Sequence, residues 1–228
     1  MVPSRSVDDD SGRLRELLLE EIESDLRATS QLLGKETLDP RVMEAMRRIH
    51  RHRFVLDEDE AHAYLNRPLG IGYGQTISQP YIVAVMTDLL EVHDDDVVLE
   101  VGTGSGYQTA VLSGLVKRIY SVEVIPELAE SAAERLGRLG FENVEVRVGD
   151  GALGWPEHAP FDGIIVTAAA PVIPPLLVDQ LKPGCRLVIP VGGDPWGQNL
   201  KVVEKSDKGE VETRSVLPVA FVPLTAGR

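Results

Sequence analysis

The apolar residues of this 228-residue chain follow two different patterns, which meet near residue 96. In the first part they recur about every 3.6 positions, the period that predicts amphipathic helices. We expect such helices at residues 13–33, 40–49 and 80–90. Residues 66–79 are rich in Gly, Pro and polar side chains, which predicts a loop that is too long to be a simple connector.

Beyond residue 96, short apolar runs alternate with helical segments, a pattern typical of a parallel sheet covered on both faces. The expected strands are 97–101, 119–124, 144–148, 163–167 and 186–191, and the expected helices are 106–115, 126–139 and 176–181. The Lys-Pro-Gly segment at 182–184 should form a turn before the last of these strands. Residues 200–204 and 211–222 are separated by a short polar turn, so they should pair as an antiparallel hairpin at one edge.

These elements predict an α/β fold with a doubly wound, mostly parallel seven-stranded sheet, N-terminal helices and a C-terminal antiparallel hairpin. Residues 1–95 should supply the N-terminal helices and the loop, and residues 96–228 should form the core that contains the sheet. A hydrophobic content of 43% is sufficient for both parts to share one compact unit.

Charge and composition exclude several kinds of partner. The net charge of −13 disfavours binding to a nucleic-acid backbone or to an anionic membrane surface. The sequence contains no run of about 18 apolar residues, so we expect no transmembrane helix. The first ten residues lack the apolar region of a signal peptide. The single cysteine fits a reducing compartment. We therefore expect a cytoplasmic monomer, without a metal site because the histidines lack zinc-type spacing.

A glycine-rich turn, Gly-Thr-Gly-Ser-Gly at residues 102–106, follows the first strand of the predicted sheet. Glycines let a ligand approach the backbone, and the start of the next helix offers free N–H groups. Such a turn also occurs as an ordinary strand-to-helix connection, so it is weak evidence by itself. A dinucleotide fingerprint would need a glycine where Tyr107 stands. Glu100 adds a negative charge, which suits a cationic ligand such as S-adenosylmethionine better than a pyrophosphate.

The next two strands also end in residues that suit this ligand. Glu123, with Val124 beside it, follows Gly102 by 21 residues, and a carboxylate at this place accepts hydrogen bonds from ribose hydroxyls. Asp150 precedes Gly151 at the end of the third strand, where it can accept from the adenine amine. An exposed strand-end acid and an Asp-Gly turn are the alternatives at these two positions. Ligands bind where the carboxyl ends of parallel strands meet, which favours a shared site.

Four further motifs occur at residues 71–80 (Ile-Gly-Tyr-Gly-Gln-Thr-Ile-Ser-Gln-Pro), 167–171 (Thr-Ala-Ala-Ala-Pro), 179–184 (Asp-Gln-Leu-Lys-Pro-Gly) and 221–225 (Phe-Val-Pro-Leu-Thr). Together with the glycine turn they resemble the protein-L-isoaspartate O-methyltransferases, a family of class I methyltransferases. The resemblance covers about residues 38–226, and its Thr-Ile-Ser-Gln-Pro part is far more specific than a glycine turn. Cys185 stands where the family usually has a second glycine, and we expect an inert packing position there.

The resemblance implies transfer of a methyl group from S-adenosylmethionine to the free α-carboxylate of an L-isoaspartyl residue in a damaged protein. A carboxylate with a pKa of about 3.5 is already ionised at neutral pH, so no strong general base is required. Ser78 would act as the catalytic residue by donating a hydrogen bond to this carboxylate, and its alternative role is to cap the following helix. The expected cofactor-binding residues are Thr76, Ile77, Ser78, Glu100, Gly102, Thr103, Gly104, Gly106, Glu123, Val124, Asp150, Gly151 and Thr225. The resemblance also implies that the last two strands exchange their usual order in the sheet.

Two other functions are compatible with parts of this pattern. A methyltransferase that acts on a small molecule or on RNA would share the glycine turn and Asp150, but the segment at 76–78 and the acidic charge oppose it. A non-catalytic binding module would be expected to lose Glu100, a glycine of the turn or Ser78, and all of them are present.

Overall fold

The computed structural model describes residues 7–193 and 197–225, and its centre is a seven-stranded sheet in the order β5-β4-β3-β6-β7-β8-β9. The strands are β3 (Val97–Val101), β4 (Arg118–Glu123), β5 (Val144–Val148), β6 (Phe161–Val166), β7 (Leu181–Val191), β8 (Gln198–Lys205) and β9 (Val211–Val219). The first five in this order are parallel, and β8 is antiparallel to both of its neighbours. The predicted α/β fold with a mostly parallel seven-stranded sheet is confirmed.

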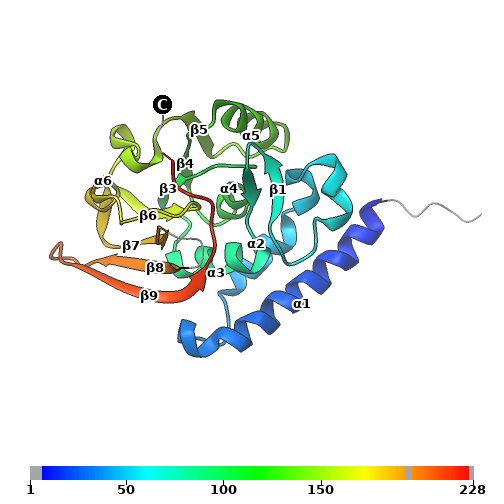
Figure 1. The fold of residues 1–228 in the computed structure, drawn as a ribbon, viewed down its shortest axis with the longest axis horizontal. Helices are drawn as coiled ribbons and strands as arrows, with labels where there is room; N and C mark the ends of the chain where they lie inside the picture. Colours follow the sequence, from blue (N-terminus) through cyan, green and yellow to red (C-terminus); the bar gives the residue numbers. More distant parts are fainter. Residues whose placement is uncertain (1–6, 194–196, 226–228) are drawn as a thin grey trace, which may run out of the picture.

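Helices cover both faces of the sheet, as predicted (Figure 1). They are α1 (Val7–Leu33), α2 (Pro40–Arg48), α3 (Pro80–Leu90), α4 (Tyr107–Ser113), α5 (Pro126–Arg138) and α6 (Pro175–Asp179), with 3-10 turns η1 (Arg51–Phe54), η2 (Asp57–His62), η3 (Gly151–Leu153) and η4 (Pro156–His158). On one face Val98 and Ile119 pack against α3, α4 and α5, and on the other Leu99 packs with α6 and Trp155. Successive strand residues point to opposite faces, so one strand contributes to both apolar clusters.

The C-terminal hairpin is confirmed, and it has the strand order that the resemblance implies. β8 lies between β7 and β9, and β9 forms the edge of the sheet. β9 ends at Val219 rather than at residue 222, and the chain then runs back across the end of the sheet (red in Figure 1). The Ala169 N–H donates to the Val222 carbonyl, and the Leu224 N–H donates to the Ala169 carbonyl. This C-terminal segment therefore lies beside the Thr-Ala-Ala-Ala segment that follows β6.

The prediction of a loop at residues 66–79 is wrong, because most of this segment forms a small hairpin. Its strands β1 (Leu69–Gly72) and β2 (Gln75–Ile77) are antiparallel. Tyr73 and Gly74 form the turn between them, with φ angles of 54° and 72°. Glycines occupy alternate positions of β1, and glycine normally indicates a loop because it has low strand propensity. For this reason the sequence of β1 does not reveal its alternation of buried and exposed residues.

Other element boundaries also differ from the prediction. α1 begins at Val7 rather than at residue 13, and α6 ends at Asp179 rather than at residue 181. The Lys-Pro-Gly segment at 182–184 lies inside β7 rather than in a turn before it. The pairing of β6 with β7 is irregular at this point, and such a bulge accommodates a proline and a positive-φ glycine within a strand.

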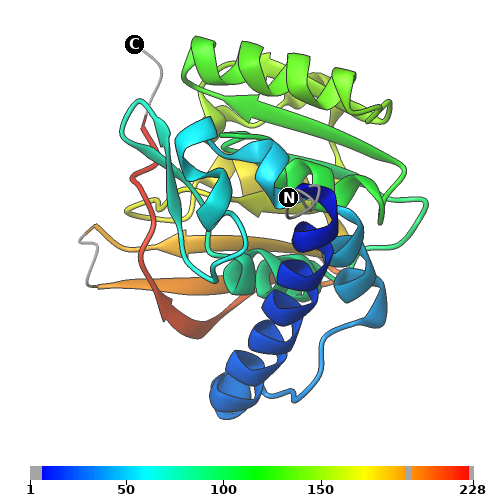
Figure 2. The same cartoon turned by 90° about the vertical axis from the view of Figure 1, so that its right-hand side faces the viewer.

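The N-terminal helices pack beside the sheet, with α1 along the outside of the molecule (Figure 2). Ile22 and Leu26 of α1 belong to the same buried apolar cluster as Leu200 of β8 and Leu217 of β9. The α3 helix lies between α1 and the sheet, since it contacts α1, β6 and β7. Within the part of the chain that the structure describes, no helix has the length and apolar character needed to cross a bilayer.

Candidate functional site

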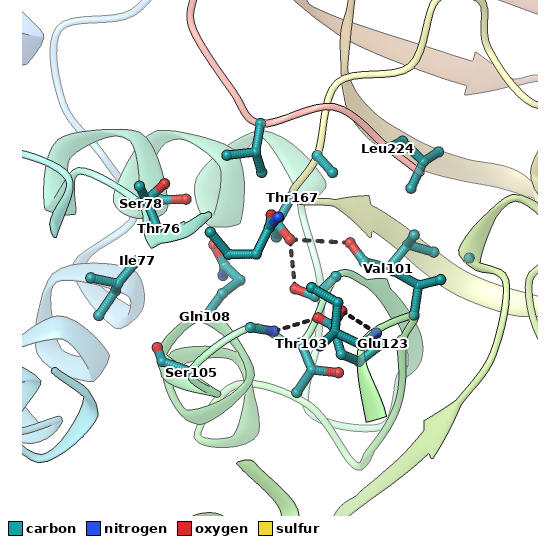
Figure 3. A pocket seen from close by; sticks show the side chains of 18 of the residues that line it. Thr76, Ile77, Ser78, Val101, Thr103, Ser105, Gln108, Glu123, Thr167 and Leu224 are labelled. Atoms are coloured by element: carbon teal, nitrogen blue, oxygen red, sulfur yellow. Dashed lines mark hydrogen bonds between the residues drawn. The ribbon is translucent and has the colours of Figure 1, made fainter. Parts of the chain in front are cut away.

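A pocket lies where β3, β4 and β6 end, at the edge of a parallel sheet that commonly binds ligands (Figure 3). β2 contributes to one wall, and the C-terminal segment contributes to another. The described lining residues are Gln75, Thr76, Ile77, Ser78, Val83, Val101, Gly102, Thr103, Gly104, Ser105, Tyr107, Gln108, Val122, Glu123, Val124, Ile125, Gly151, Thr167, Ala168, Val222, Pro223, Leu224 and Thr225. The site is therefore assembled from segments that lie far apart in the sequence.

The glycine turn is held against the end of β6 by Thr167. The Thr167 hydroxyl donates to the Gly102 carbonyl oxygen at 2.6 Å. Gly102 has a φ of 95°, and a Cβ atom on it would lie 2.4 Å from the Thr167 Oγ1 atom. Only glycine therefore fits this position, because a side chain would be strained and would collide with the hydroxyl that holds the turn.

Glu123, the last residue of β4, is fixed by two backbone donors. The Gly104 N–H donates to its Oε2 atom at 2.8 Å, and the Ile125 N–H donates to its Oε1 atom at 3.0 Å. The residue is only 6% exposed, yet it lines the pocket, as does Val124. A carboxylate oxygen can accept more than one hydrogen bond, so Glu123 retains acceptor capacity for ligand hydroxyls.

Glu123 is also the only charged residue in the described lining of the pocket. Lysine, arginine and histidine are absent from this lining, and apolar side chains such as Ile77, Val101 and Leu224 form much of the wall. Such a wall offers no cation to a phosphate, whereas the single carboxylate favours a ligand with positive charge. The electrostatics thus oppose a dinucleotide and suit a cationic nucleoside.

The structure does not bring Glu100 into the pocket lining. Its side chain is fully buried below the turn, where the hydroxyls of Thr109 and Ser121 donate to its Oε2 atom. Ser121 also forms a 2.6 Å hydrogen bond with Thr103, which does line the pocket. Burial raises the pKa of Glu100 to about 7, although the two hydroxyl bonds oppose this shift. We expected Glu100 to place a negative charge beside the ligand. In the structure, Glu123 places a carboxylate in the pocket and Glu100 does not.

Gly106 and Asp150 border the pocket without lining it. Gly106, with a φ of 86°, precedes α4 and packs against α5. The Asp150 carboxylate accepts from the Ala152 N–H at 2.9 Å, so one of its oxygens caps the short η3 turn. Gly151 does line the pocket, and a Cβ atom on it would lie 2.3 Å from the Val101 Cγ1 atom. The chain is thus tightly packed at the end of β5.

Ser78 lies at the junction between β2 and α3, and its hydroxyl is free. The N-cap of α3 is Gln79, without a side-chain hydrogen bond, so the alternative role of Ser78 as the helix cap is wrong. Among the residues that the structure describes, none forms a hydrogen bond with the Ser78 hydroxyl. The α3 backbone itself is fixed by Asn66, whose Oδ1 atom accepts from the Tyr81 N–H at 3.0 Å. A free hydroxyl therefore stands directly before a helix start that Asn66 holds by a hydrogen bond.

A second cavity adjoins the pocket at this junction. Its described lining residues are Pro68, Thr76, Ser78, Gln79, Ile82, Thr167, Pro218, Val219, Ala220 and Phe221. Thr76, Ser78 and Thr167 line both spaces, so they form the boundary between them. The second cavity has no charged side chain among these residues, and its wall combines hydroxyl and amide groups with apolar surface.

The expected cofactor-binding residues that this pocket brings together are Thr76, Ile77, Ser78, Gly102, Thr103, Gly104, Glu123, Val124, Gly151 and Thr225. Thr167 opens the motif at residues 167–171 but had no predicted role, and Gln108 lies in none of the motifs. Thr167 follows a strand that ends at the same sheet edge as Gly102, which could have indicated it. Gln108 is a polar residue in the buried first turn of α4, where an apolar residue would be ordinary. Groups of acids, histidines and cysteines suited to a metal ion are absent from the described residues.

Comparison with known proteins gives a consistent result over almost the whole chain. A profile of the family described as protein-L-isoaspartate(D-aspartate) O-methyltransferase matches residues 28–228. The chain is 63% identical over 222 residues to a Syntrophobacter fumaroxidans protein named protein-L-isoaspartate O-methyltransferase 2. This similarity covers 97% of the chain and 90% of that protein.

Two solved structures have a similar fold. One, named protein-L-isoaspartate O-methyltransferase, has a TM-score of 0.77 and 26% identity, with coverage of 91% of this chain and 66% of that one. The other, from Plasmodium falciparum, is described as the same kind of enzyme in complex with S-adenosyl-L-homocysteine. It has a TM-score of 0.74 and 22% identity, with coverage of 92% of this chain and 98% of that one. At this identity the similarity shows that the two chains share a fold and carries no statement about function.

Proposed function

The chain belongs to the protein-L-isoaspartate(D-aspartate) O-methyltransferase family, and from this we propose how its pocket and second cavity perform the reaction. The enzyme is a protein repair methyltransferase that transfers a methyl group from S-adenosylmethionine to the free α-carboxylate of L-isoaspartyl residues. The observation that carries the assignment of roles is the free Ser78 hydroxyl, which stands at the boundary of two adjoining spaces.

The pocket is suited to S-adenosylmethionine, which supplies a methyl group on a positively charged sulfur. Glu123 offers a fixed carboxylate for the ribose hydroxyls, and the described lining has no cation that would repel the sulfonium. We place the adenine near Gly151, with Asp150 as a nearby acceptor for its amine. Apolar side chains around the pocket exclude water, which strengthens electrostatic interactions within it.

The second cavity is where we place the isoaspartyl segment of the substrate. Its uncharged, partly apolar wall accepts a peptide without competing for the carboxylate. The Ser78 hydroxyl donates to that carboxylate, and the N-terminus of the 11-residue α3 helix adds favourable partial charge. Together they hold one carboxylate oxygen in line with the methyl group. A new C–O bond forms as the C–S bond breaks, and no proton is transferred.

Because the carboxylate is already ionised at neutral pH, the chain needs no general base for this step. Positioning and the exclusion of water therefore account for the catalysis. We further propose that residues 1–95 and 96–228 work as one unit, because Thr76 and Ser78 come from the first part and Glu123 from the second. A monomer in the cytoplasm without nucleic-acid partners is the form that best fits a chain of net charge −13 with a single cysteine.

Transfer of labelled methyl groups from S-adenosylmethionine tests this function. An isoaspartyl peptide should be methylated, and the same peptide with normal aspartate should not. Methylation of RNA or a small metabolite, with none of the isoaspartyl peptide, would support the alternative methyltransferase and overturn the proposal.

Ser78→Ala tests the role assigned to the free hydroxyl. Loss of one positioned donor should lower turnover on the isoaspartyl peptide by roughly 10- to 1000-fold, the range for donors of this kind. Binding of S-adenosylhomocysteine should change much less, because Glu123 and the glycine turn are intact. Ser30→Ala is a matched control, since the hydroxyl of this half-buried serine hydrogen-bonds only to the Arg27 carbonyl within α1. Near-normal turnover of Ser78→Ala would mean that the backbone holds the carboxylate without this hydroxyl.

A further inference from the structure

Gln108 lies in the first turn of α4, where it lines the cofactor pocket although it is only 7% exposed. Figure 3 shows Gln108 and Glu123 on different sides of this pocket. The sequence motifs give Gln108 no role, and the reaction as described above does not use it. A largely buried amide that faces a ligand pocket must nevertheless satisfy its donors and acceptor, so its hydrogen bonds are informative.

The hydrogen bonds of Thr87 fix the direction of this amide. The Thr87 hydroxyl donates its hydrogen to the Val83 carbonyl oxygen at 2.7 Å. Its oxygen can then only accept, and the Gln108 Nε2 atom donates to it at 2.8 Å. With the nitrogen held in this way, the Oε1 atom of Gln108 is left without a partner among the described residues. This Oε1 atom is not among the fully buried polar atoms that lack a partner, so it remains accessible to a ligand in the pocket.

The Gln108 Oε1 atom is therefore an oriented hydrogen-bond acceptor without a donor among the described residues. If the pocket binds S-adenosylmethionine as proposed above, the ligand has three kinds of donor: the adenine amine, the ribose hydroxyls and the methionyl ammonium. The first two belong to the ends of β5 and β4, near Asp150 and Glu123. We propose that Gln108 binds the methionyl ammonium through Oε1, with Thr87 as the residue that orients it. This inference rests on the proposed function of the pocket.

Calorimetry with three ligands isolates the predicted contact. S-adenosylhomocysteine carries both the amine and the carboxylate, its decarboxylated analogue carries only the amine, and 5′-methylthioadenosine carries neither. Gln108→Met keeps the length of the side chain but removes the acceptor. It should weaken binding of the first two ligands by roughly 10- to 100-fold, as expected for a hydrogen bond to a charged group. Binding of 5′-methylthioadenosine should be unchanged, which also shows that the pocket is folded.

The other outcomes overturn the inference in distinguishable ways. A loss confined to S-adenosylhomocysteine would show that Gln108 donates to the carboxylate instead. An equal loss for all three ligands would show a structural role, and unchanged binding of all three would remove Gln108 from the site. If the unmodified protein binds none of the ligands, the proposed function itself fails.

Two further variants test the orienting role of Thr87. Thr87→Val removes the oxygen that accepts from Gln108, so the amide can turn and part of the affinity for the amine-bearing ligands should be lost. Thr87→Ser keeps the hydroxyl and should bind like the unmodified protein. Gln108→Glu retains an acceptor and should restore binding relative to Gln108→Met. Failure of this rescue, together with normal binding by Thr87→Val, would contradict an oriented acceptor.

Discussion

Replacing Glu100 by glutamine tests whether this buried carboxyl group titrates between the unfolded and the folded protein as its raised pKa predicts. Glu100 is fully buried, and its Oε2 atom accepts from the hydroxyls of Thr109 and Ser121. Its Oε1 atom has no hydrogen-bond partner among the described residues. Glutamine has nearly the same shape and keeps one oxygen that can accept from both hydroxyls, but it cannot ionise. The substitution therefore removes the titration of this site while leaving the packing almost unchanged.

The effect on stability has a definite sign. Burial is the main cause that raises the pKa of Glu100 from 4.5 to about 7, and the charge of Glu123 adds a smaller part. The folded protein thus holds this proton more tightly than the unfolded chain does. The resulting contribution to the free energy of unfolding is complete below pH 4.5 and is lost as the pH rises through about 7. Between about pH 5 and pH 8 the loss amounts to about 2–3 kcal/mol, at about 1.4 kcal/mol per pKa unit.

Urea unfolding at several pH values between these limits measures this loss. The difference in unfolding free energy between the unmodified protein and Glu100→Gln should change by about 2–3 kcal/mol across the range, in favour of the variant at high pH. Histidines and other titrating groups are common to both proteins, so they cancel in the difference. A constant difference would refute the argument, because it would mean that the two hydroxyl bonds keep Glu100 ionised throughout.

Two other substitutions test the cofactor pocket. Glu123→Ala removes the fixed acceptor at the end of β4 and should weaken S-adenosylhomocysteine binding at least about tenfold in calorimetry, and unchanged affinity would remove Glu123 from the site. Gly102→Ala would place a Cβ atom 2.4 Å from the Thr167 hydroxyl at a φ of 95°, so both thermal stability and cofactor affinity should fall. Gly70→Ala is its control, because a Cβ atom there meets nothing within 4 Å.

The pattern of apolar residues predicts the centre of the sheet because the parallel strands β3 and β6 are buried on both faces and appear as largely apolar runs. The hairpin of β8 and β9 is predicted equally well, since a short polar turn can join only antiparallel neighbours. The hairpin of β1 and β2 is not predicted, because its two strands contain four and three residues and glycine alternates with the apolar residues of β1. So short a pairing is stabilised by its tertiary contacts rather than by its own strand propensity.

The site was predictable in its chain segments but not in every side chain. Glu100 and Val101 are neighbours in β3, and their side chains point to opposite faces of the sheet. Val101 lines the pocket, so Glu100 points away from it and meets Thr109 of α4. Gln108 was missed for the converse reason. Its role depends on the hydroxyl of Thr87 in α3, and no local pattern in the sequence shows that these two helices meet at this point.

The position of Ser78 depends on a similar long-range contact, and this gives α1 a part in the site. The Asn66 side chain accepts from the Tyr81 N–H in the first turn of α3, and its Nδ2 atom donates to the Asp25 carboxylate at 2.8 Å. Thr29 of α1 also hydrogen-bonds with the Tyr81 hydroxyl. The start of α3, and with it the Ser78 hydroxyl, is thus held against a helix that mostly precedes the family match at residue 28. α1 contributes no residue to the described lining of either cavity, but its hydrogen bonds fix the junction that carries Ser78, the residue that we propose holds the carboxylate of the substrate.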